Sequence, residues 1–480
     1  MEKLRKIIQQ LSAKDFTQIK SALEKNSSEK FLQVLIAYRD NENTEETIRK
    51  SIGCSEGAFY VLRSRLLVKI QELLLENNDA HKPNFLQDGT TLTQYLYEYP
   101  RETAITILQQ LEKIYINNDT PQELINVYSA LKKTHYHSDK YYYYSQLYNK
   151  HIAYTVALEK AEDILLNFNR TLANYYFSRT KGDIELLVVL KKEIRNIYSL
   201  NQSHRFELIK NFILIQSQLF TSIEQTDEQD VEVLIKRCDQ LVAEFVEDKQ
   251  IKYYALVVNY FWFEYYFKTN QLKKAWNYFE IINKNEKTWL LLGNYCMAFK
   301  FLFTKPQLLY ELNKIDELSE EDILVDSYDF YTAIALKFCK AITNIYHKNI
   351  DKSIDILNEL IRDISLHHFF HLEIEIKMTL AYLYINQNKH EKADRFLKSL
   401  VRKIDIDRKE DYQNALMFMK LLNVLMEESK SAANKDKAQK ALEQFNLFNT
   451  FERRILCFLQ PEIESYIKQI YILEKDKTLK

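Results

Sequence analysis

The sequence predicts an all-α protein built from helical repeats, and three observations carry that prediction. Glycine and proline are scarce, at five residues each in a chain of 480, whereas sheet proteins and α/β enzymes need many turn glycines. Apolar residues make up 46% of the chain and charged residues 28%, which supplies both a core and solvated faces. From about residue 101 onward, apolar stripes with helical spacing alternate with short polar turns. Because a single core stops growing at ~250–300 residues, we expect several domains or a repeat array.

Residues 1–79 are expected to form a small N-terminal helical module. The first segment, MEKLRKIIQQLSAKDF, is charged and amphipathic, which indicates a helix and not a signal peptide. Three of the five prolines follow close together, at Pro83, Pro100 and Pro121, and proline marks linkers and helix starts. We therefore expect a linker at 80–100 and a repeat array over 101–475.

Residues 51–67, SIGCSEGAFYVLRSRLL, resemble the second half of a helix-turn-helix, as in sigma-factor region 4 and related regulators. Ile52 and Gly53 match the turn, where glycine can take the left-handed conformation that ends a helix, and Ser55 can cap the next helix. The resemblance implies DNA binding, and its candidate contacts are Arg49, Lys50, Ser55, Arg63, Arg65 and Lys69.

The same stretch also departs from that family. A recognition helix presents polar side chains to base edges, whereas this sequence places Ala58, Tyr60, Val61 and Leu62 on that front. Residues 1–78 carry 13 basic and 11 acidic side chains, a net charge of +2, which is a faint footprint for phosphate binding. We expect a structural cap or a partner-docking module, with DNA binding as the alternative.

Four segments of the array share a helix–turn–helix pattern: 173–194, 262–282, 341–361 and 381–401. A small or apolar residue recurs in the second helix of each, at Leu187, Ala275, Ser353 and Ala393, and the last two are 40 residues apart. The pattern resembles tetratricopeptide repeats, in which a small residue lets the second helix approach the first, although their period is ~34. The resemblance implies a right-handed superhelix with a concave surface that binds a peptide or a partner helix.

The run KYYYYSQLYNKHIAY at 140–154 is interpreted as core packing. Four consecutive helical residues spread over ~300° around the axis and cannot share one face. One stripe joins Tyr141, Tyr144 and Tyr148, and another joins Tyr143, Leu147 and Tyr154. A helix that is apolar on two sides is expected between neighbours; a stacking platform for a ligand is the alternative.

Asparagines on first helices suggest a peptide groove. Asn174, Asn259 and Asn344 are 85 residues apart, about two repeat periods. In arrays of this type such asparagines often hold the backbone of a bound peptide. With the adjacent Tyr175 and Tyr260 they are the candidate groove residues, although codon bias also supplies many asparagines.

One set of side chains has metal-ligand spacing. His367, His371 and Glu375 follow one another at i, i+4 and i+8, and one helix face could present all three to a zinc or nickel ion. A polar stripe on a repeat helix is the more ordinary explanation.

The remaining patterns favour a binding protein over an enzyme. No phosphate-binding loop, GxSxG or HExxH occurs, and we expect neither catalysis nor a cofactor. The formal net charge of −1 creates no global field for nucleic acid or a membrane, and the five cysteines are expected to be free thiols. We expect a cytoplasmic, bacterial scaffold or adaptor that binds a protein or peptide partner. The alternative is a transcriptional regulator in which the array is the sensor.

Overall fold

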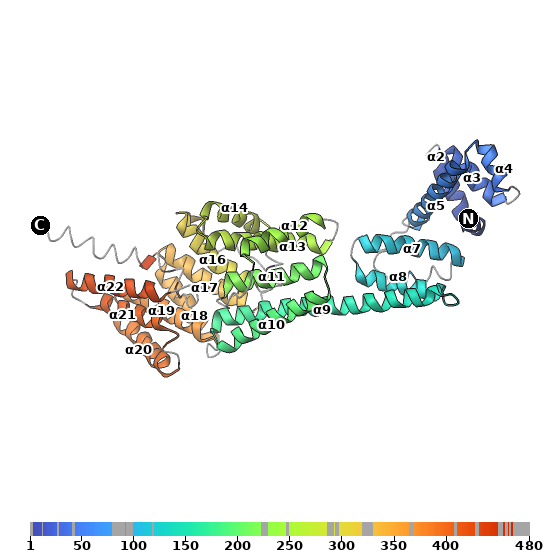
Figure 1. Ribbon diagram of the computed structural model, residues 1–480. Helices are drawn as coiled ribbons and strands as arrows, with labels where there is room; N and C mark the ends of the chain where they lie inside the picture. Colours follow the sequence, from blue (N-terminus) through green and yellow to red (C-terminus); the bar gives the residue numbers. More distant parts are fainter. Residues whose placement is uncertain are drawn as a thin grey trace. The chain divides into compact units, whose positions relative to one another are not determined.

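The computed structural model describes residues 3–11, 13–25, 28–40, 44–78, 92, 99–117, 120–221, 229–245, 249–285, 292, 297–318, 330–363, 369–407, 410–427, 432–449, 455–456, 459 and 462–463. Within these ranges the chain folds into helices and contains no strand, which confirms the all-α, helical-repeat prediction (Figure 1). The chain divides into two compact units, Met1–Glu159 and Lys160–Lys480. This boundary lies inside α9 (Lys140–Ser178). Of the expected linker at 80–100, only residues 92, 99 and 100 are described.

The first unit begins with five helices: α1 (Lys3–Gln10), α2 (Ala13–Lys25), α3 (Glu29–Asp40), α4 (Glu45–Ile52) and α5 (Glu56–Asn78). Apolar side chains from all five form one core, which includes Ile8, Leu23, Leu35 and Leu66. The guanidinium of Arg39 closes the end of α1, because its Nη1 donates to the carbonyls of Ile8, Gln9 and Leu11 at 2.9, 3.0 and 2.8 Å. Helices α1 and α5 also contact α7 (Arg101–Asn117), so the N-terminal module and the next helices belong to one unit.

A second core of the first unit joins α7, α8 (Pro121–Thr134) and the beginning of α9. Helix α8 starts at Pro121, where the missing N–H costs no hydrogen bond. Leu108, Leu131 and Tyr144 are buried between the three helices. Tyr144 therefore fixes which side of α9 faces inward.

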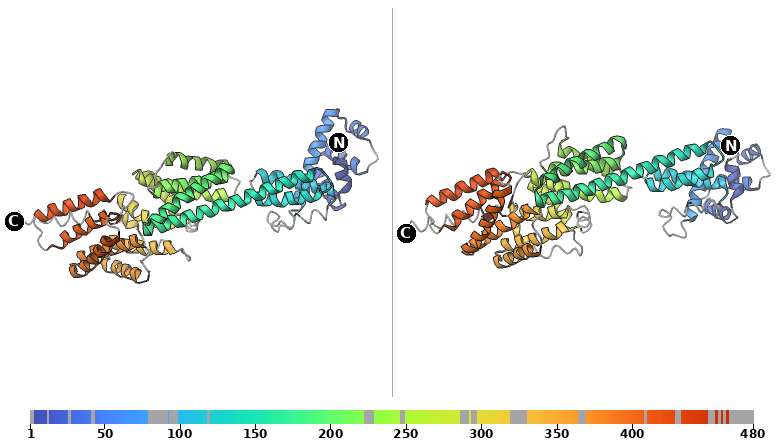
Figure 2. Two further views of the ribbon diagram at one scale, coloured as in Figure 1. Left: turned by 60° about the horizontal axis from the view of Figure 1, so that its bottom comes forward. Right: turned by 90° about the horizontal axis from the view of Figure 1, so that it is seen from below.

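The second unit contains the end of α9 and a succession of helices that pack against their neighbours in sequence. They are α10 (Lys181–Leu200), α11 (His204–Phe220), α12 (Val231–Glu244), α13 (Lys249–Lys268), α14 (Leu272–Asn283), α16 (Ala298–Glu311), the short 3₁₀ helix η2 (Ile315–Glu317), α17 (Phe330–Tyr346), α18 (Ile350–Asp363), α19 (Phe370–Asn386), α20 (His390–Asp407), α21 (Gln413–Met426) and α22 (Ala432–Phe448). The pairs α19–α20 and α21–α22, drawn in orange and red, lie side by side in every view (Figures 1 and 2).

Three helix pairs of this unit, α13–α14, α17–α18 and α19–α20, are joined by the same turn. A residue with positive φ follows each first helix: Asn270 (57°), Lys348 (63°) and Asn388 (57°). The next N–H donates to the carbonyl five residues earlier at 2.8 Å, as from Lys389 to Tyr384. This is the Schellman geometry, which satisfies the free carbonyls at a helix end and usually uses glycine. The chain forms it with asparagine or lysine, which explains why glycine is so scarce.

The small residues predicted to be equivalent follow these turns at the same distance. Ala275, Ser353 and Ala393 are each fully buried against the first helix of their pair, and Ser353 Oγ donates to the Ala341 carbonyl at 2.9 Å. Leu187 is not equivalent to them. It lies seven residues after its cap Thr180, whereas Ala275 lies four after its cap Gln271. The α9–α10 turn has a different geometry, because the Thr180 hydroxyl accepts from Asp183 N at 3.2 Å.

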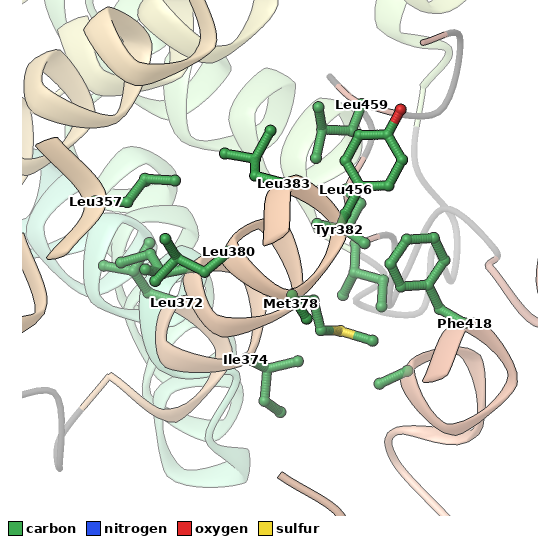
Figure 3. Close-up of a cluster of buried hydrophobic side chains, with 14 of the residues drawn as sticks. Leu357, Leu372, Ile374, Met378, Leu380, Tyr382, Leu383, Phe418, Leu456 and Leu459 are labelled. Carbon is green, nitrogen blue, oxygen red and sulfur yellow. The ribbon is translucent and has the colours of Figure 1, made fainter. Parts of the chain in front are cut away.

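The largest core of the second unit gathers side chains from α9 and from α16 to α22. Figure 3 shows part of it, with Leu456 and Leu459 of the C-terminal residues in the same cluster as Tyr382 and Leu383 of α19. The side-chain amide of Asn449 holds this end of the chain, because its Oδ1 accepts from Ile455 N at 2.8 Å and its Nδ2 donates to Ile455 O at 3.0 Å.

In the described ranges, no helix combines the length and the apolar composition that crossing a bilayer requires. Three of the five cysteines are described, and Cys54, Cys238 and Cys339 are all free thiols. Cys296 and Cys457 lie outside the described residues.

Candidate partner-binding surface

The end of α8 and the start of α9 carry a group of exposed aromatic side chains in the first unit. Tyr136, Tyr142 and Tyr143 are 68%, 71% and 57% exposed. We call these three, together with Tyr141 and His137, the tyrosine surface. Large aromatic rings are usually buried in monomeric proteins and are enriched at interfaces, so this cluster is the best candidate for a binding surface in the first unit.

Helix geometry explains why these rings are outside. Successive residues of a helix are ~100° apart, and Tyr144 is buried in the core between α7, α8 and α9. Tyr142 and Tyr143 therefore point away from the core. The interpretation of the run as core packing is correct for Tyr144 and wrong for Tyr142 and Tyr143, because α9 is covered on one side only at this point.

The turn between α8 and α9 holds the surface in place. The buried ring of His135 stacks on Tyr144 with centroids 5.2 Å apart, and Ser138 N donates to the His135 carbonyl at 2.9 Å. Tyr141 N, in the first turn of α9, then donates to the Ser138 carbonyl at 2.9 Å. Arg101 Nε of α7 donates to the Thr134 carbonyl at 2.7 Å. The exposed rings thus stand on a turn whose backbone is hydrogen-bonded on both sides.

The rings contact one another mainly edge to face. Tyr136 lies against Tyr141 with centroids 5.7 Å apart at 81°, and Tyr141 lies against Tyr142 at 5.5 Å and 81°. Beneath them, burial raises the pKa of the Tyr144 phenol, whose oxygen accepts from Gln109 Nε2 at 3.3 Å. The inner phenol is therefore neutral and structural, while the outer phenol groups of Tyr136, Tyr142 and Tyr143 face solvent.

The stretch that resembles a helix-turn-helix folds as two helices joined by a tight turn. Gly53 ends α4 with a φ of 69°, a conformation that suits glycine. Ser55 caps α5, since its Oγ accepts from Ala58 N at 3.3 Å. Both expectations for the local backbone are met.

The candidate DNA contacts differ in exposure and in their ion-pair partners. Arg63 is held by Glu45 of α4 through a 2.7 Å ion pair and is mostly buried, so it does not point outward. Lys50 pairs with Glu46 at 2.9 Å on the exposed side of α4. Ser55 and Arg65 are exposed, whereas Arg49 and Lys69 are half-buried. The outer side of α5 also presents Tyr60 and Val61, 65% and 46% exposed.

The five candidate groove residues do not form one surface. Tyr175, Tyr260 and Asn344 are buried in the core of the second unit. The carbonyl of Asn344 belongs to the turn after α17 and accepts from Asn349 N, whereas Asn259 lies in the middle of α13. Asn174 Nδ2 donates to Asp183 Oδ1 at 2.7 Å and so links α9 to α10. The 85-residue spacing therefore does not reflect equivalent positions.

Helix α9 packs on α16 and on α17, the helix that carries the candidate groove residue Asn344. The Phe177 ring lies 5.5 Å from Phe299 of α16 and 5.6 Å from Tyr331 of α17. Tyr176 contacts Phe299 and Phe303 of α16 at 5.3 and 5.5 Å. Helices α16 and α19 are buried along most of their length, so the chain itself occupies this side of the array.

The candidate metal ligands belong to the core. His371 and Glu375 are buried, with His371 Nε2 3.6 Å from Glu375 Oε1, and Leu456 N donates to Glu375 Oε1 at 3.3 Å. Burial raises the pKa of the Glu375 carboxyl to about 7 and lowers that of the His371 imidazole well below its ordinary value. The His371 imidazole is then neutral near pH 7, where the Glu375 carboxyl is about half protonated. His367 lies outside the described residues, and those that are described include no cluster of three metal-ligating side chains.

No protein-family model matches the chain, and no curated protein matches it either. The function must therefore be argued from the surfaces themselves.

Proposed function

We propose that this protein is a non-catalytic adaptor, a TPR-like helical-repeat protein that binds a protein partner through the tyrosine surface. The observation that supports this most directly is the exposure of Tyr136, Tyr142 and Tyr143 on a hydrogen-bonded turn. Tyrosine is enriched among the residues that dominate binding energy, because its ring gives a large contact area at a low cost in conformational entropy. This moves the expected binding site from a concave groove to the end of α8 and the start of α9.

Site-specific crosslinking tests the proposal. A photo-crosslinking amino acid replaces Tyr142 in the full-length chain, and a matched chain carries it at Tyr253, which is 49% exposed on α13. We expect one discrete protein adduct from position 142 and none from position 253. Equal labelling at both positions would show that the tyrosine surface has no partner of its own.

A triple variant gives the second measurement. Tyr136→Ser, Tyr142→Ser and Tyr143→Ser together remove the exposed rings and leave Tyr144 in the core. We expect the adduct partner to be lost from pull-downs, while far-UV circular dichroism and the melting temperature stay unchanged, because the removed side chains bury little area.

The second candidate function is a DNA-binding regulator, favoured by the geometry of Gly53 and Ser55. Titration with random duplex DNA at 50 and 200 mM salt tests it. Submicromolar binding that collapses at the higher salt, and that Arg65→Ala and Lys69→Ala weaken, would place this function first. We expect no such binding, because Arg63 is paired internally and Tyr60 and Val61 occupy the front of α5.

A further inference from the structure

The tyrosine surface lies in a part of the first unit that has an excess of positive charge. Between Glu123 and Glu159 the chain carries four lysines (Lys132, Lys133, Lys140 and Lys150) and a single acidic residue, Asp139. These 35 residues (124–158) therefore have a net charge of 4 − 1 = +3, although the whole chain has a net charge of −1. The excess of positive charge coincides with the exposed rings.

Two of these lysines flank the rings and are not neutralised. Lys133 lies in the last turn of α8 and Lys140 is the first residue of α9, and both are exposed. Neither forms an ion pair within the described part of the chain, in contrast to Lys50 and Lys236, which pair with glutamates on their own helices. Lys132 is engaged differently, because its Nζ lies 4.4 Å from the centroid of the Tyr148 ring.

The exposed phenol groups add hydrogen-bond donors to these charges. The hydroxyl groups of Tyr136, Tyr142 and Tyr143 have no hydrogen-bond partner among the described residues, and the rings that carry them are more than half exposed. A phenol O–H and an ammonium group both donate, and both pair well with anionic oxygen atoms. We infer that the tyrosine surface binds an acidic protein segment, whose carboxylates meet Lys133, Lys140 and the phenol groups and whose apolar side chains cover the rings.

This inference rests on the proposed function and specifies the chemistry of the partner. A nucleic acid offers the same negative charge but would stack its bases on open ring faces. Here the rings pack against each other, with Tyr136 held edge to face by His137 and Tyr141 at 5.0 and 5.7 Å. Rings that meet at 86° and 81° do not form the parallel platforms on which successive bases stack, and Asp139 lies between the two lysines in sequence. An acidic polypeptide fits this arrangement better than a polyphosphate backbone.

The test uses the full-length chain and three fluorescent probes. The first is a 20-residue peptide of alternating Glu and Leu or Phe, the second is the same peptide with Lys in place of Glu, and the third is oligo(dT) of 20 nucleotides. We expect binding of the acidic peptide alone, about fivefold or more weaker at 200 mM than at 50 mM salt because exposed charges are screened.

A charge-reversal pair provides the variant and its matched control. Lys133→Glu with Lys140→Glu should weaken binding of the acidic peptide about tenfold. Lys181→Glu with Lys273→Glu makes the same change in net charge at two exposed lysines of α10 and α14, and should alter binding less than twofold. Equal effects of the two pairs would show a response to net charge only and would overturn the inference.

The remaining outcomes separate this inference from the proposed function. Equal binding of the acidic and basic peptides would refute the acidic partner, and so would tighter binding of oligo(dT) that is lost with Tyr142→Ser. If the two peptides bind equally but the crosslinked adduct from position 142 is still formed, the adaptor function remains supported. Absence of that adduct would refute the adaptor function.

Discussion

At the scale of single residues, the buried pair His371 and Glu375 is expected to make the stability of the fold depend on pH. Among the described residues, the Glu375 carboxylate accepts one hydrogen bond, from Leu456 N at 3.3 Å, and it lies 3.6 Å from His371 Nε2. His371 Nδ1 has no hydrogen-bond partner among the described residues. Arg179, of the α9–α10 turn, acts on both groups electrostatically, and the Tyr412 ring lies 5.8 Å from the His371 ring. Because desolvation dominates, each group is more easily kept neutral than charged.

The two titrations act on stability in opposite directions. The folded-state pKa of Glu375 is raised from 4.5 to about 7. Its contribution to the free energy of unfolding is therefore fully present below pH 4.5 and is lost as the pH rises through 7. The pKa of His371 is lowered below 6.5, so its contribution is present above pH 6.5 and is lost as the pH falls. Between pH 4.5 and 7 the wild type should therefore lose up to about 3 kcal/mol of its free energy of unfolding through this group, and Glu375→Gln should abolish that loss.

Urea unfolding at pH 5 and pH 7.5 measures this effect. Glu375→Gln should be stabilised relative to wild type at pH 7.5 much more than at pH 5. His371→Gln is the complementary variant, and it should be stabilised relative to wild type mainly at pH 5. If the free energy of unfolding changed equally with pH in all three proteins, these two groups would not have the shifted pKa values.

At the scale of elements, the helix pairs of the second unit depend on one turn geometry. Asn388 has a φ of 57°, and its neighbour Lys389 N donates to the Tyr384 carbonyl at 2.8 Å. Asparagine tolerates the left-handed conformation better than other non-glycine residues. The sequence shows the polar turns but not this conformation, because the asparagines and lysines that form it also occur throughout the helices.

Asn388→Ala should lower the free energy of unfolding by about 1 kcal/mol, since alanine is strained at positive φ. Asn388→Gly keeps the conformation accessible and should be neutral or slightly stabilising. Urea midpoints of the two variants distinguish a conformational role from a side-chain role. A loss of stability in the glycine variant equal to that in the alanine variant would show that the amide itself matters.

For the α8–α9 pair, the sequence pattern predicts the helix but not which of its sides are covered. The predicted stripe of Tyr141, Tyr144 and Tyr148 lies on a helix and contains the buried Tyr144, whereas the second predicted stripe begins at Tyr143, which is exposed. The spacing does not show how many sides of that helix are covered, because coverage depends on neighbours elsewhere in the chain. The excess of lysine around the run is a signal that was present in the sequence and would have favoured exposure.

At the scale of the whole molecule, the core of the second unit depends on contacts between distant segments. Phe177 of α9 is fully buried against α16 and α17, more than 100 residues away in sequence. Repeat arrays are held by neighbouring repeats, and this contact adds a non-local connection to them. The unit should therefore unfold more cooperatively than an open array.

Phe177→Ala should destabilise the second unit by about 3–5 kcal/mol, the usual cost of a large cavity. Tryptophan fluorescence reports this unit alone, because Trp262, Trp276 and Trp289 all follow residue 160. Leu166→Ala on the same helix is the control, since Leu166 is 46% exposed and its loss should cost less than about 0.5 kcal/mol. A similar shift for both variants would contradict the role of Phe177.

The sequence by itself determined the helical class, the helix pairs with their small residues Ala275, Ser353 and Ala393, and the local backbone at Gly53 and Ser55. These features follow from periodicity and from interactions between residues close in the chain, which a linear pattern records. Tertiary structure alone decided that α9 covers α16 and α17, that Arg63 pairs with Glu45, and that Tyr142 and Tyr143 remain outside. Each of these depends on which distant side chains come to lie nearby, and burial is a property of that arrangement and not of the residue.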